Sequence, residues 1–284
     1  MTGGPVARPV ARFSLATGMP APMSPADDER VRIEDRGGEG VRLVRIHRPD
    51  KRNALDGPTR EALLDRMEEV VEDGARVLVL TGSEGTFASG ADLAEMRERS
   101  VDEQRDFVAL PRMYERIEGL STPVIAAIDG HALGAGLELA LACDVRVAAE
   151  GAKLGSPEVN LGIIPGGGAT QRLPRLVGLG QAMRLVLSGD LVAAGEAREL
   201  GMVEVHADEG EAADEALGLA GSMADHSAVA LAGAKRALRD SWQTHLAEGL
   251  RREIDRFADV FGSRDAQEGI EAFLEDREPE FEHR

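Results

Sequence analysis

Two uninterrupted apolar runs, at residues 77–80 and 124–128, constrain the fold of this chain more than any other feature. Short runs without polar interruption are typical of strands buried on both faces of a parallel sheet. Each run is followed by a glycine cluster, at residues 82–90 and 134–136, that leads toward a helix. The repeated order of strand, glycine loop and helix predicts an α/β fold with parallel strand pairing.

Weaker patterns extend this order along the first half of the chain. Apolar runs separated by glycines predict a hairpin over residues 31–46. A helical pattern follows, from Pro58 to Gly74. The other elements expected before residue 150 are a mostly helical segment at 101–120, a helix at 137–143 and a strand at 145–147.

Beyond Gly178 the sequence predicts a helical layer with one short strand at 202–206. The expected helices cover residues 179–188, 194–200, 211–225, 227–240, 245–261 and 264–275. These patterns divide the chain into a core at 29–210 and a C-terminal helical region at 211–284.

Residues 1–28 are rich in Gly, Ala, Pro and Ser, a composition that cannot bury enough surface to order itself, so they predict a disordered leader. A transit-like interpretation stays open, because Arg8 and Arg12 precede the first acidic residue.

Charge and composition exclude several classes of partner. The 284 residues carry a net charge of -18 without any Lys/Arg-rich run, so a phosphate backbone would be repelled. Aromatic residues make up only 3%, too few for a base-stacking surface. No apolar stretch reaches the roughly 18 residues that a membrane helix needs. The single cysteine, Cys143, fits a reducing compartment, so we expect a cytoplasmic protein without nucleic-acid or membrane partners.

The glycine clusters match neither the dinucleotide-binding pattern nor a P-loop, and metal-binding motifs such as C-x-x-C are missing, so no metal site is expected. Glycine lets a ligand approach the backbone closely, and the start of a helix supplies N–H groups with partial positive charge. This describes an oxyanion site. Alternatively, each loop only makes a tight turn. Two similar loops favour the first hypothesis, because an enolate needs donors that converge from more than one direction.

Two carboxylates lie near the second glycine cluster and near a third one, at residues 166–168. Glu138 occupies the first turn of an apolar helix, where it could simply favour the helix dipole. Glu158 lies in a loop and could be solvated surface. Together in a desolvated cleft, they would take different pKa values and could divide acid and base roles.

Three other side chains invite a chemical role but are better explained as structural. Ser89 lacks the G-x-S-x-G context of a nucleophile, and His131 lies on a turn. Cys143 falls within an apolar helix and is expected in the core.

Several ordered motifs then resemble one family. They are the segments at 47–55 (HRPDKRNAL), 87–93 (FASGADL), 130–139 (GHALGAGLEL), 143–144 (CD), 156–172 (SPEVNLGIIPGGGATQR) and 268–277 (EGIEAFLEDR). Together they resemble the crotonase, or enoyl-CoA hydratase/isomerase, superfamily, from about residue 31 to the C-terminus.

The resemblance implies an α/β fold: a crotonase-like spiral of ββα units in the core, followed by a C-terminal helical oligomerisation region that forms a homotrimer or a dimer of trimers. It implies an enoyl-CoA hydratase of fatty acid β-oxidation, with no cofactor other than the coenzyme A that the acyl-CoA substrate carries. The alternatives are a double-bond isomerase, an acyl-CoA hydrolase, or a non-catalytic acyl-CoA-binding or RNA-binding relative.

The resemblance also assigns site residues. It places the oxyanion N–H groups at Ala91 and Ala135, the water-activating carboxylate at Glu138 and the Cα-protonating acid at Glu158. The residues expected around the substrate are Lys51, Arg52, Ala54, Ala88, Ser89, Gly90, Asp92, Leu93, Gly134, Pro157, Gly166 and Phe273. Ala94 and Asp276 stand where the family often has lysines near the CoA phosphates, which leaves Lys51 and Arg52 as candidate cations.

Overall fold

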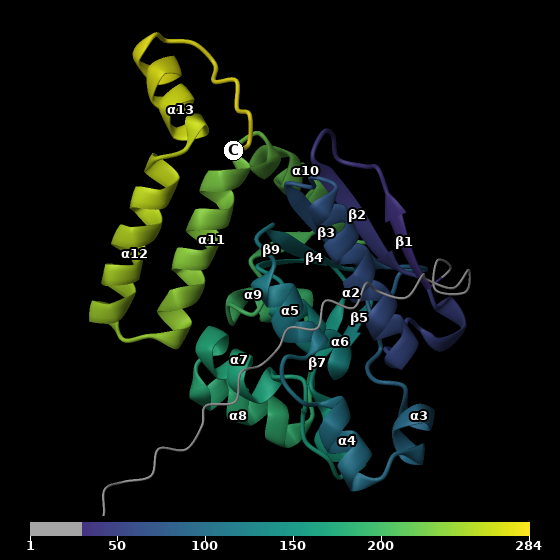
Figure 1. The fold of residues 1–284 in the computed structure, drawn as a ribbon. Helices are drawn as coiled ribbons and strands as arrows, with labels where there is room; N and C mark the ends of the chain where they lie inside the picture. Colours follow the sequence, from purple (N-terminus) through teal and green to yellow (C-terminus); the bar gives the residue numbers. More distant parts are fainter. Residues whose placement is uncertain (1–29) are drawn as a thin grey trace, which may run out of the picture.

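The structure is a computed structural model that describes residues 30–284, so the expected leader at 1–28 lies outside the described residues (Figure 1). Its larger sheet has the strand order β1-β2-β3-β4-β6-β9. β1 (Val31–Glu34) and β2 (Val41–Ile46) form the antiparallel hairpin that the sequence predicts. The later strands pair in parallel: β3 (Val77–Gly82), β4 (Val124–Ile128), β6 (Val145–Ala149) and β9 (Val205–Ala207). The parallel α/β architecture is therefore confirmed.

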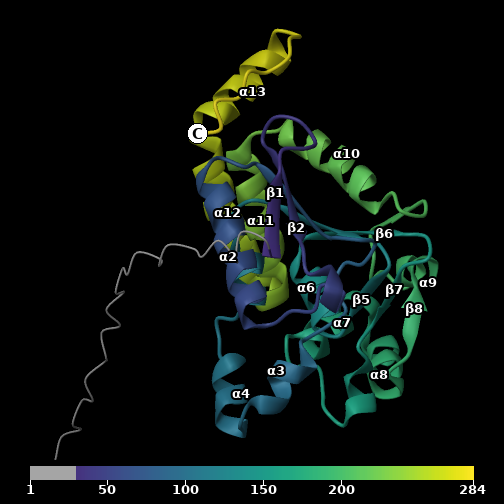
Figure 2. The ribbon, with the colours of Figure 1, turned by 90° about the vertical axis from the view of Figure 1, so that its right-hand side faces the viewer.

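A smaller sheet was not predicted. It consists of β5 (His131–Leu133), β7 (Lys153–Gly155) and β8 (Leu191–Ala193), in the order β5-β7-β8 (Figure 2). Each strand has three residues, too few for an alternating pattern to be recognised. β5 directly precedes the second glycine loop, and the amide of Gly134 donates to the carbonyl of Gly155 at 2.9 Å. The small sheet therefore fixes the loop at 134–136.

Alternate side chains of the large sheet pack against different helices. Val77 and Val79 of β3 face a cluster with the alanine-rich α10 (Ala212–Ala224). Leu78 and Leu80 face the opposite cluster, with α2 (Gly57–Glu72), α5 (Met113–Gly119) and α6 (Ala135–Ala142). Both faces of the sheet are thus buried, which explains the uninterrupted apolar runs.

The remaining short elements surround these layers. They are η1 (Pro49–Lys51), α3 (Leu93–Glu98), α4 (Val101–Phe107), η2 (Pro157–Leu161), α7 (Ala169–Val177), α8 (Leu179–Ser188) and α9 (Ala194–Glu199). The mixed segment at 101–120 is helical as expected, but it divides into α4 and α5.

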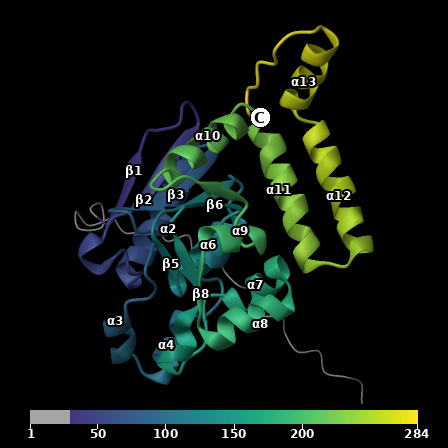
Figure 3. The ribbon, with the colours of Figure 1, turned by 180° about the vertical axis from the view of Figure 1, so that it is seen from behind.

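The C-terminal helices stand beside the sheet body. α11 (Ala228–Gln243) and α12 (Leu246–Phe261) lie side by side, and α13 (Arg264–Leu274) continues from the end of α12 (Figures 1 and 3). All three agree with the predicted helices to within three residues at each end. α12 has no buried residue. Among the described helices, none is both long and apolar enough to cross a membrane.

Candidate active site

A cavity of about 580 Å³ brings the two glycine loops together with η2 and the segment that contains α3, α4 and α5. It contains both carboxylates that the sequence singles out, Glu138 and Glu158. The other predicted site residues that line it are Ser89, Gly90, Ala91, Leu93, Gly134, Ala135, Pro157 and Gly166. Segments far apart in the sequence thus meet at one desolvated site.

The backbone around the first glycine loop is held by its neighbours. The amide of Leu55 donates to the carbonyl of Gly90 at 2.8 Å, and the amide of Ser89 donates to the carbonyl of Arg52 at 3.1 Å. Gly90 has φ 123°, a conformation that favours glycine, and it turns the chain just before Ala91. The Ala91 amide is therefore presented by a loop in which the Ser89 amide and the Gly90 carbonyl are both hydrogen-bonded.

The second glycine loop ends in a helix. Gly134, with φ 51°, precedes Ala135, the first residue of α6. An amide at this position has no partner within its own helix and carries part of the positive end of the helix dipole. A Cβ on Gly136 would overlap the Ala88 carbonyl, so glycine is needed for the two loops to approach. Ala91 and Ala135 line the same cavity, as an oxyanion site requires.

Glu138 is buried at the base of this cavity, with 3% of its surface exposed. Its Oε1 accepts hydrogen bonds from the amides of Gly167, at 2.6 Å, and Ala169, at 3.1 Å. Burial raises the pKa of Glu138, and these two hydrogen bonds oppose the rise. A Cβ on Gly167 would overlap Oε2 of Glu138, so a glycine is required there. The third glycine cluster therefore holds this carboxylate in one orientation.

Glu158 has a different environment. It lies in η2, and its Oε2 is buried without a hydrogen-bond partner among the described residues. Burial, together with the negative charge of Glu138, raises the pKa of Glu158 to about 7. A Cβ on Gly134 would come within 3.2 Å of its Oε1. One carboxylate is thus hydrogen-bonded to fixed amides, whereas the other is free to exchange a proton near neutral pH.

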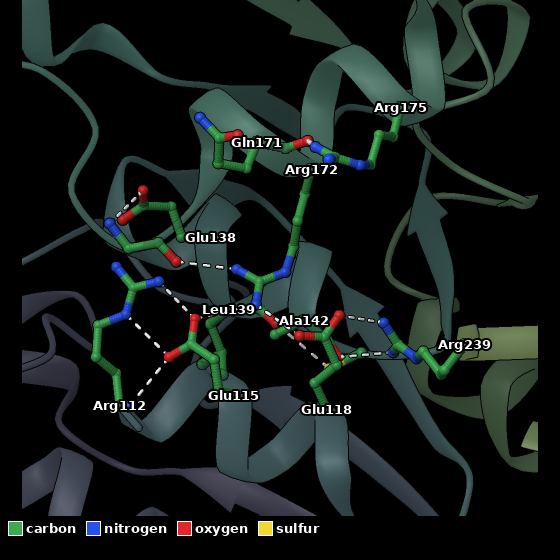
Figure 4. A network of polar contacts seen from close by, with 12 residues as sticks. Arg112, Glu115, Glu118, Glu138, Leu139, Ala142, Gln171, Arg172, Arg175 and Arg239 are labelled. Atoms are coloured by element: carbon green, nitrogen blue, oxygen red, sulfur yellow. Dashed lines mark hydrogen bonds and ion pairs between the residues drawn. The ribbon is translucent and has the colours of Figure 1, made fainter. Parts of the chain in front are cut away.

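Two arginines fix the loop that holds Glu138 (Figure 4). The guanidinium of Arg112 donates to the carbonyl of Gly166, and Nη1 of Arg172 donates to the carbonyl of Gly167 at 3.0 Å. Consecutive carbonyls are therefore held by different side chains, while the Gly167 amide faces Glu138.

Acidic residues of α5 hold these arginines in turn. Arg112 pairs with Glu115 at 2.5 Å, and Arg172 pairs with Glu118 at 2.8 Å. Glu118 also pairs with Arg239 of α11, which reaches Asp144 at 2.9 Å (Figure 4). A continuous chain of ion pairs thus joins the support of Glu138 to the C-terminal helices.

One wall of the cavity was not predicted from the sequence. This wall is formed by three residues of α2, α4 and α5 and by two arginines that have acidic partners. They are Arg60, Phe107, Tyr114, Arg99 and Arg112. Their segments show no motif and give only a mixed helical pattern. The signal available in the sequence was the arginine content of a helical segment, which by itself indicates a solvated face.

Several predicted substrate contacts lie next to the cavity rather than in its wall. Lys51 and Arg52 are exposed beside the first glycine loop, and Ala54 and Ala88 are buried behind it. Ala54 and Ala88 can therefore support the backbone of the loop, whereas Lys51 and Arg52 lie at the rim of the site. The side chain of Asp92 caps α3 by accepting from the amide of Ala94 at 3.1 Å.

Phe273 is not brought to this cavity. It lies on α13 with 85% of its surface exposed. Cys143 is buried, as the core interpretation expects, and burial raises its pKa to about 12.

Comparison with known proteins identifies the family. The sequence profile described as "Enoyl-CoA hydratase/isomerase" matches residues 36–284. The chain belongs to this family. It is 42% identical over 245 residues to the 2,3-dehydroadipyl-CoA hydratase of Escherichia coli K12, covering 86% of this chain and 96% of the relative. It is 41% identical over 246 residues to the crotonyl-CoA hydratase of Syntrophomonas wolfei, covering 86% and 95%.

Solved structures of this hydratase/isomerase family share the fold. The crystal structure of enoyl-CoA hydratase from Mycobacterium tuberculosis H37Rv aligns with a TM-score of 0.83 at 35% identity, covering 90% of this chain and 100% of that chain. A Geobacillus kaustophilus HTA426 enoyl-CoA hydratase structure aligns with a TM-score of 0.84 at 36% identity, covering 90% and 98%. The crotonase-type fold expected from the motifs is therefore confirmed.

Proposed function

We propose that this family member is a 2-enoyl-CoA hydratase, which adds water across the 2,3 double bond to give a 3-hydroxyacyl-CoA. The observation that carries the proposal is the pair of unlike carboxylates, Glu138 and Glu158, in one cavity with the amides of Ala91 and Ala135. Isomerisation or hydrolysis on such a scaffold needs only one of the two carboxylates. Both are buried enough to have raised pKa values, as acid–base work near neutral pH requires.

In the proposed mechanism the thioester oxygen accepts hydrogen bonds from the amides of Ala91 and Ala135. As water attacks Cβ, negative charge develops on this oxygen and strengthens both bonds. Loss of one oxyanion donor typically costs about 100- to 1000-fold in rate. The donors therefore act mainly on the enolate rather than on the bound substrate.

The two glutamates divide the proton transfers. Glu138, held by the amides of Gly167 and Ala169, orients the water and accepts its proton as the oxygen bonds to Cβ. Glu158, with a pKa of about 7, donates its proton to Cα. The hydroxyl group thus ends on Cβ and a proton on Cα. Proton exchange with solvent then returns Glu138 to its ionised form and Glu158 to its protonated form. General acid or base help of this kind is worth about 100- to 10,000-fold.

We propose that the CoA part extends toward Lys51 and Arg52, which are exposed beside the first glycine loop. The chain carries a net charge of -18, and Ala94 and Asp276 supply no positive charge, so local cations matter for an anionic cofactor. CoA enters only as part of the substrate.

The function is tested by mixing purified protein with crotonyl-CoA and following loss of the conjugated thioester absorbance. We expect rapid loss with the natural sequence and a decrease of about 100-fold or more with Glu158→Gln. Failure to hydrate 2-enoyl-CoA thioesters of any chain length would contradict the proposal. Full activity of Glu158→Gln would contradict only the role of that residue.

We further propose a homotrimer or a dimer of trimers that acts in the cytoplasm on fatty acyl thioesters. An apolar stripe along α12 supports oligomerisation: Leu246, Leu250, Ile254, Phe257 and Phe261 are all exposed and recur at helical spacing. A contiguous exposed apolar surface of this kind marks an interaction site. The unpaired thiol of Cys143 supports a reducing compartment.

A further inference from the structure

One arginine in the cavity forms no ion pair in the part of the chain that the structure describes. Arg99 pairs with Glu95 at 2.6 Å, and Arg112 pairs with Glu115 at 2.5 Å. Arg60, which lines the same cavity, forms no ion pair with any carboxylate within residues 30–284, although its positive charge opposes the rise in the pKa of Glu138. Its Nε donates to the carbonyl of Leu55 at 3.3 Å and its guanidinium also interacts with the Tyr114 hydroxyl, so at most three of the five N–H groups remain available.

The position of Arg60 is fixed by aromatic rings. Its Cζ lies 4.9 Å from the ring centroid of Phe107 and 5.5 Å from that of Tyr114, within the range of cation–π contacts. Rings favour the charge but accept no conventional hydrogen bond. The guanidinium is therefore oriented in the cavity wall, with donors that still need an acceptor.

The hydroxyl of Tyr114 lies beside it. Only 1% of this residue is exposed, and Arg60 lies within hydrogen-bonding range of the hydroxyl oxygen. The hydroxyl proton has no acceptor in the described part of the chain, and buried polar groups normally have partners, so a ligand acceptor is indicated. Arg60 offers only donors and Tyr114 can add another. The complementary group is an acceptor with several lone pairs, which describes a carboxylate.

The wall formed by these residues adjoins Glu138. A Cβ on Gly167 would overlap both Tyr114 and Glu138, so the Tyr114 ring lies directly beside the proposed water-activating carboxylate. With the thioester carbonyl at Ala91 and Ala135 and Cβ at Glu138, the next carbons lead toward Tyr114 and Arg60. The CoA part is proposed to extend toward Lys51 and Arg52, which do not line this wall.

We propose that the preferred substrate is a 2-enoyl-CoA whose acyl chain ends in a carboxylate, and that Arg60 and Tyr114 bind this carboxylate. The inference rests on the proposed hydratase function. A planar guanidinium binds a carboxylate through two parallel hydrogen bonds, which gives direction as well as affinity. A neutral chain of the same length would leave the charge and the buried hydroxyl without a partner, so a site of this kind discriminates against it.

The test compares 2-hexenedioyl-CoA with 2-hexenoyl-CoA, which has the same length and no terminal charge. We expect kcat/KM to favour the diacid thioester by about tenfold or more. Arg60→Met keeps the apolar stem and should lower this ratio about 10- to 100-fold, and Tyr114→Phe should lower it by about two- to tenfold. Arg116→Met is the matched control: Arg116 pairs with Glu68 outside the cavity, so the ratio should not change.

The ratio separates substrate binding from a general effect on Glu138. If Arg60→Met lowered kcat/KM equally for both substrates, or if the natural sequence favoured the neutral one, the carboxylate site would be refuted while hydration stood. Binding of the unreactive adipyl-CoA and hexanoyl-CoA, followed by calorimetry, is independent of turnover. A preference for adipyl-CoA that Arg60→Met removes, without any hydration, would support the site and refute only the hydratase function. Equal binding of both would refute the site.

Discussion

Nη1 of Arg172 donates a 3.0 Å hydrogen bond to the carbonyl of Gly167, the residue whose amide donates to Glu138. A charged side chain that never touches the substrate thus sets the direction of the proposed water-activating carboxylate. Arg172 is 6% exposed and its charge is balanced by Glu118 and Glu115 of α5, at 2.8 and 3.3 Å. Because Arg172 is held by its acidic partners and Gly167 by Arg172, a small displacement of the Arg172 side chain should also move Glu138.

Arg172→Met should therefore lower kcat by about tenfold or more with little change in KM, since misplaced catalytic groups lose rate rather than binding. It should also lower the melting temperature, because breaking a buried ion pair typically costs about 3–5 kcal/mol. Steady-state kinetics with crotonyl-CoA and thermal unfolding measure the two effects. Arg175→Met, on the exposed face of the same helix, is the control. A lower melting temperature with unchanged kcat would mean that Arg172 only stabilises the fold.

Gly167→Ala should reduce hydration about 100-fold or more while the protein stays folded. The added Cβ would overlap Oε2 of Glu138 and the ring of Tyr114, so the carboxylate must turn away from its amide donors. The same substitution at Gly180, on the exposed surface of α8, meets no atom within 4 Å and serves as the control. Circular dichroism checks folding. Equal activity of the two variants would argue against a fixed orientation of Glu138.

Local sequence patterns determine the buried strands and the long helices of this protein, whereas its shortest strands depend on tertiary contacts. The buried strands at 77–80 and 124–128 could be predicted because burial on both faces removes every polar residue from the run. β5, β7 and β8 could not, since three residues carry no period. The long helices α10 to α13 could be predicted because apolar residues recur at helical spacing along them.

The residues of the site also divide into those that local sequence patterns predict and those that depend on tertiary contacts. Glu138 and Glu158 were found because they interrupt recognisable glycine-rich motifs. Arg60 and Tyr114 come from segments without a motif, and they reach the cavity only because α2 and α5 pack together. A long cationic side chain in a helix is normally solvated, so the sequence alone favours the wrong environment for Arg60.

The pH dependence of hydration should follow the proton on Glu158. The proposed acid must be protonated before it can donate to Cα, and its pKa is about 7. We therefore expect kcat/KM for hydration to decrease as the pH rises through about 7. Hydration consumes no net proton, so its equilibrium constant does not change with pH, and kcat/KM for dehydration of 3-hydroxybutyryl-CoA should follow the same profile. A decrease near pH 7 that persisted unchanged in Glu158→Gln would contradict the assignment.

Stability should depend on pH through the same residue. The folded protein raises the pKa of Glu158 above its ordinary value of 4.5, so the folded state binds this proton more tightly than the unfolded state. Its contribution is therefore most favourable below about pH 4.5 and is lost as the pH rises through about 7. Glu158→Gln removes the ionisation, so it should raise the melting temperature at pH 8 and have little effect at pH 5. Glu253→Gln on α12 is the control. A stabilisation that did not change with pH would be inconsistent with a buried ionising carboxyl.

The apolar stripe on α12 should determine the oligomeric state. Phe257 is 69% exposed and stacks on Phe261, with ring centroids 5.9 Å apart. Phe257→Glu places a charge in the middle of the stripe, where burial against another copy would cost several kcal/mol. We expect sedimentation analysis to show a mass of three or six times the 30.2 kDa chain for the natural sequence, and a shift toward one chain for the variant. Arg251→Glu adds an acid beside the stripe on the same helix and should leave the mass unchanged. A monomeric natural protein, or an unaltered oligomer in Phe257→Glu, would exclude this surface as the contact between chains.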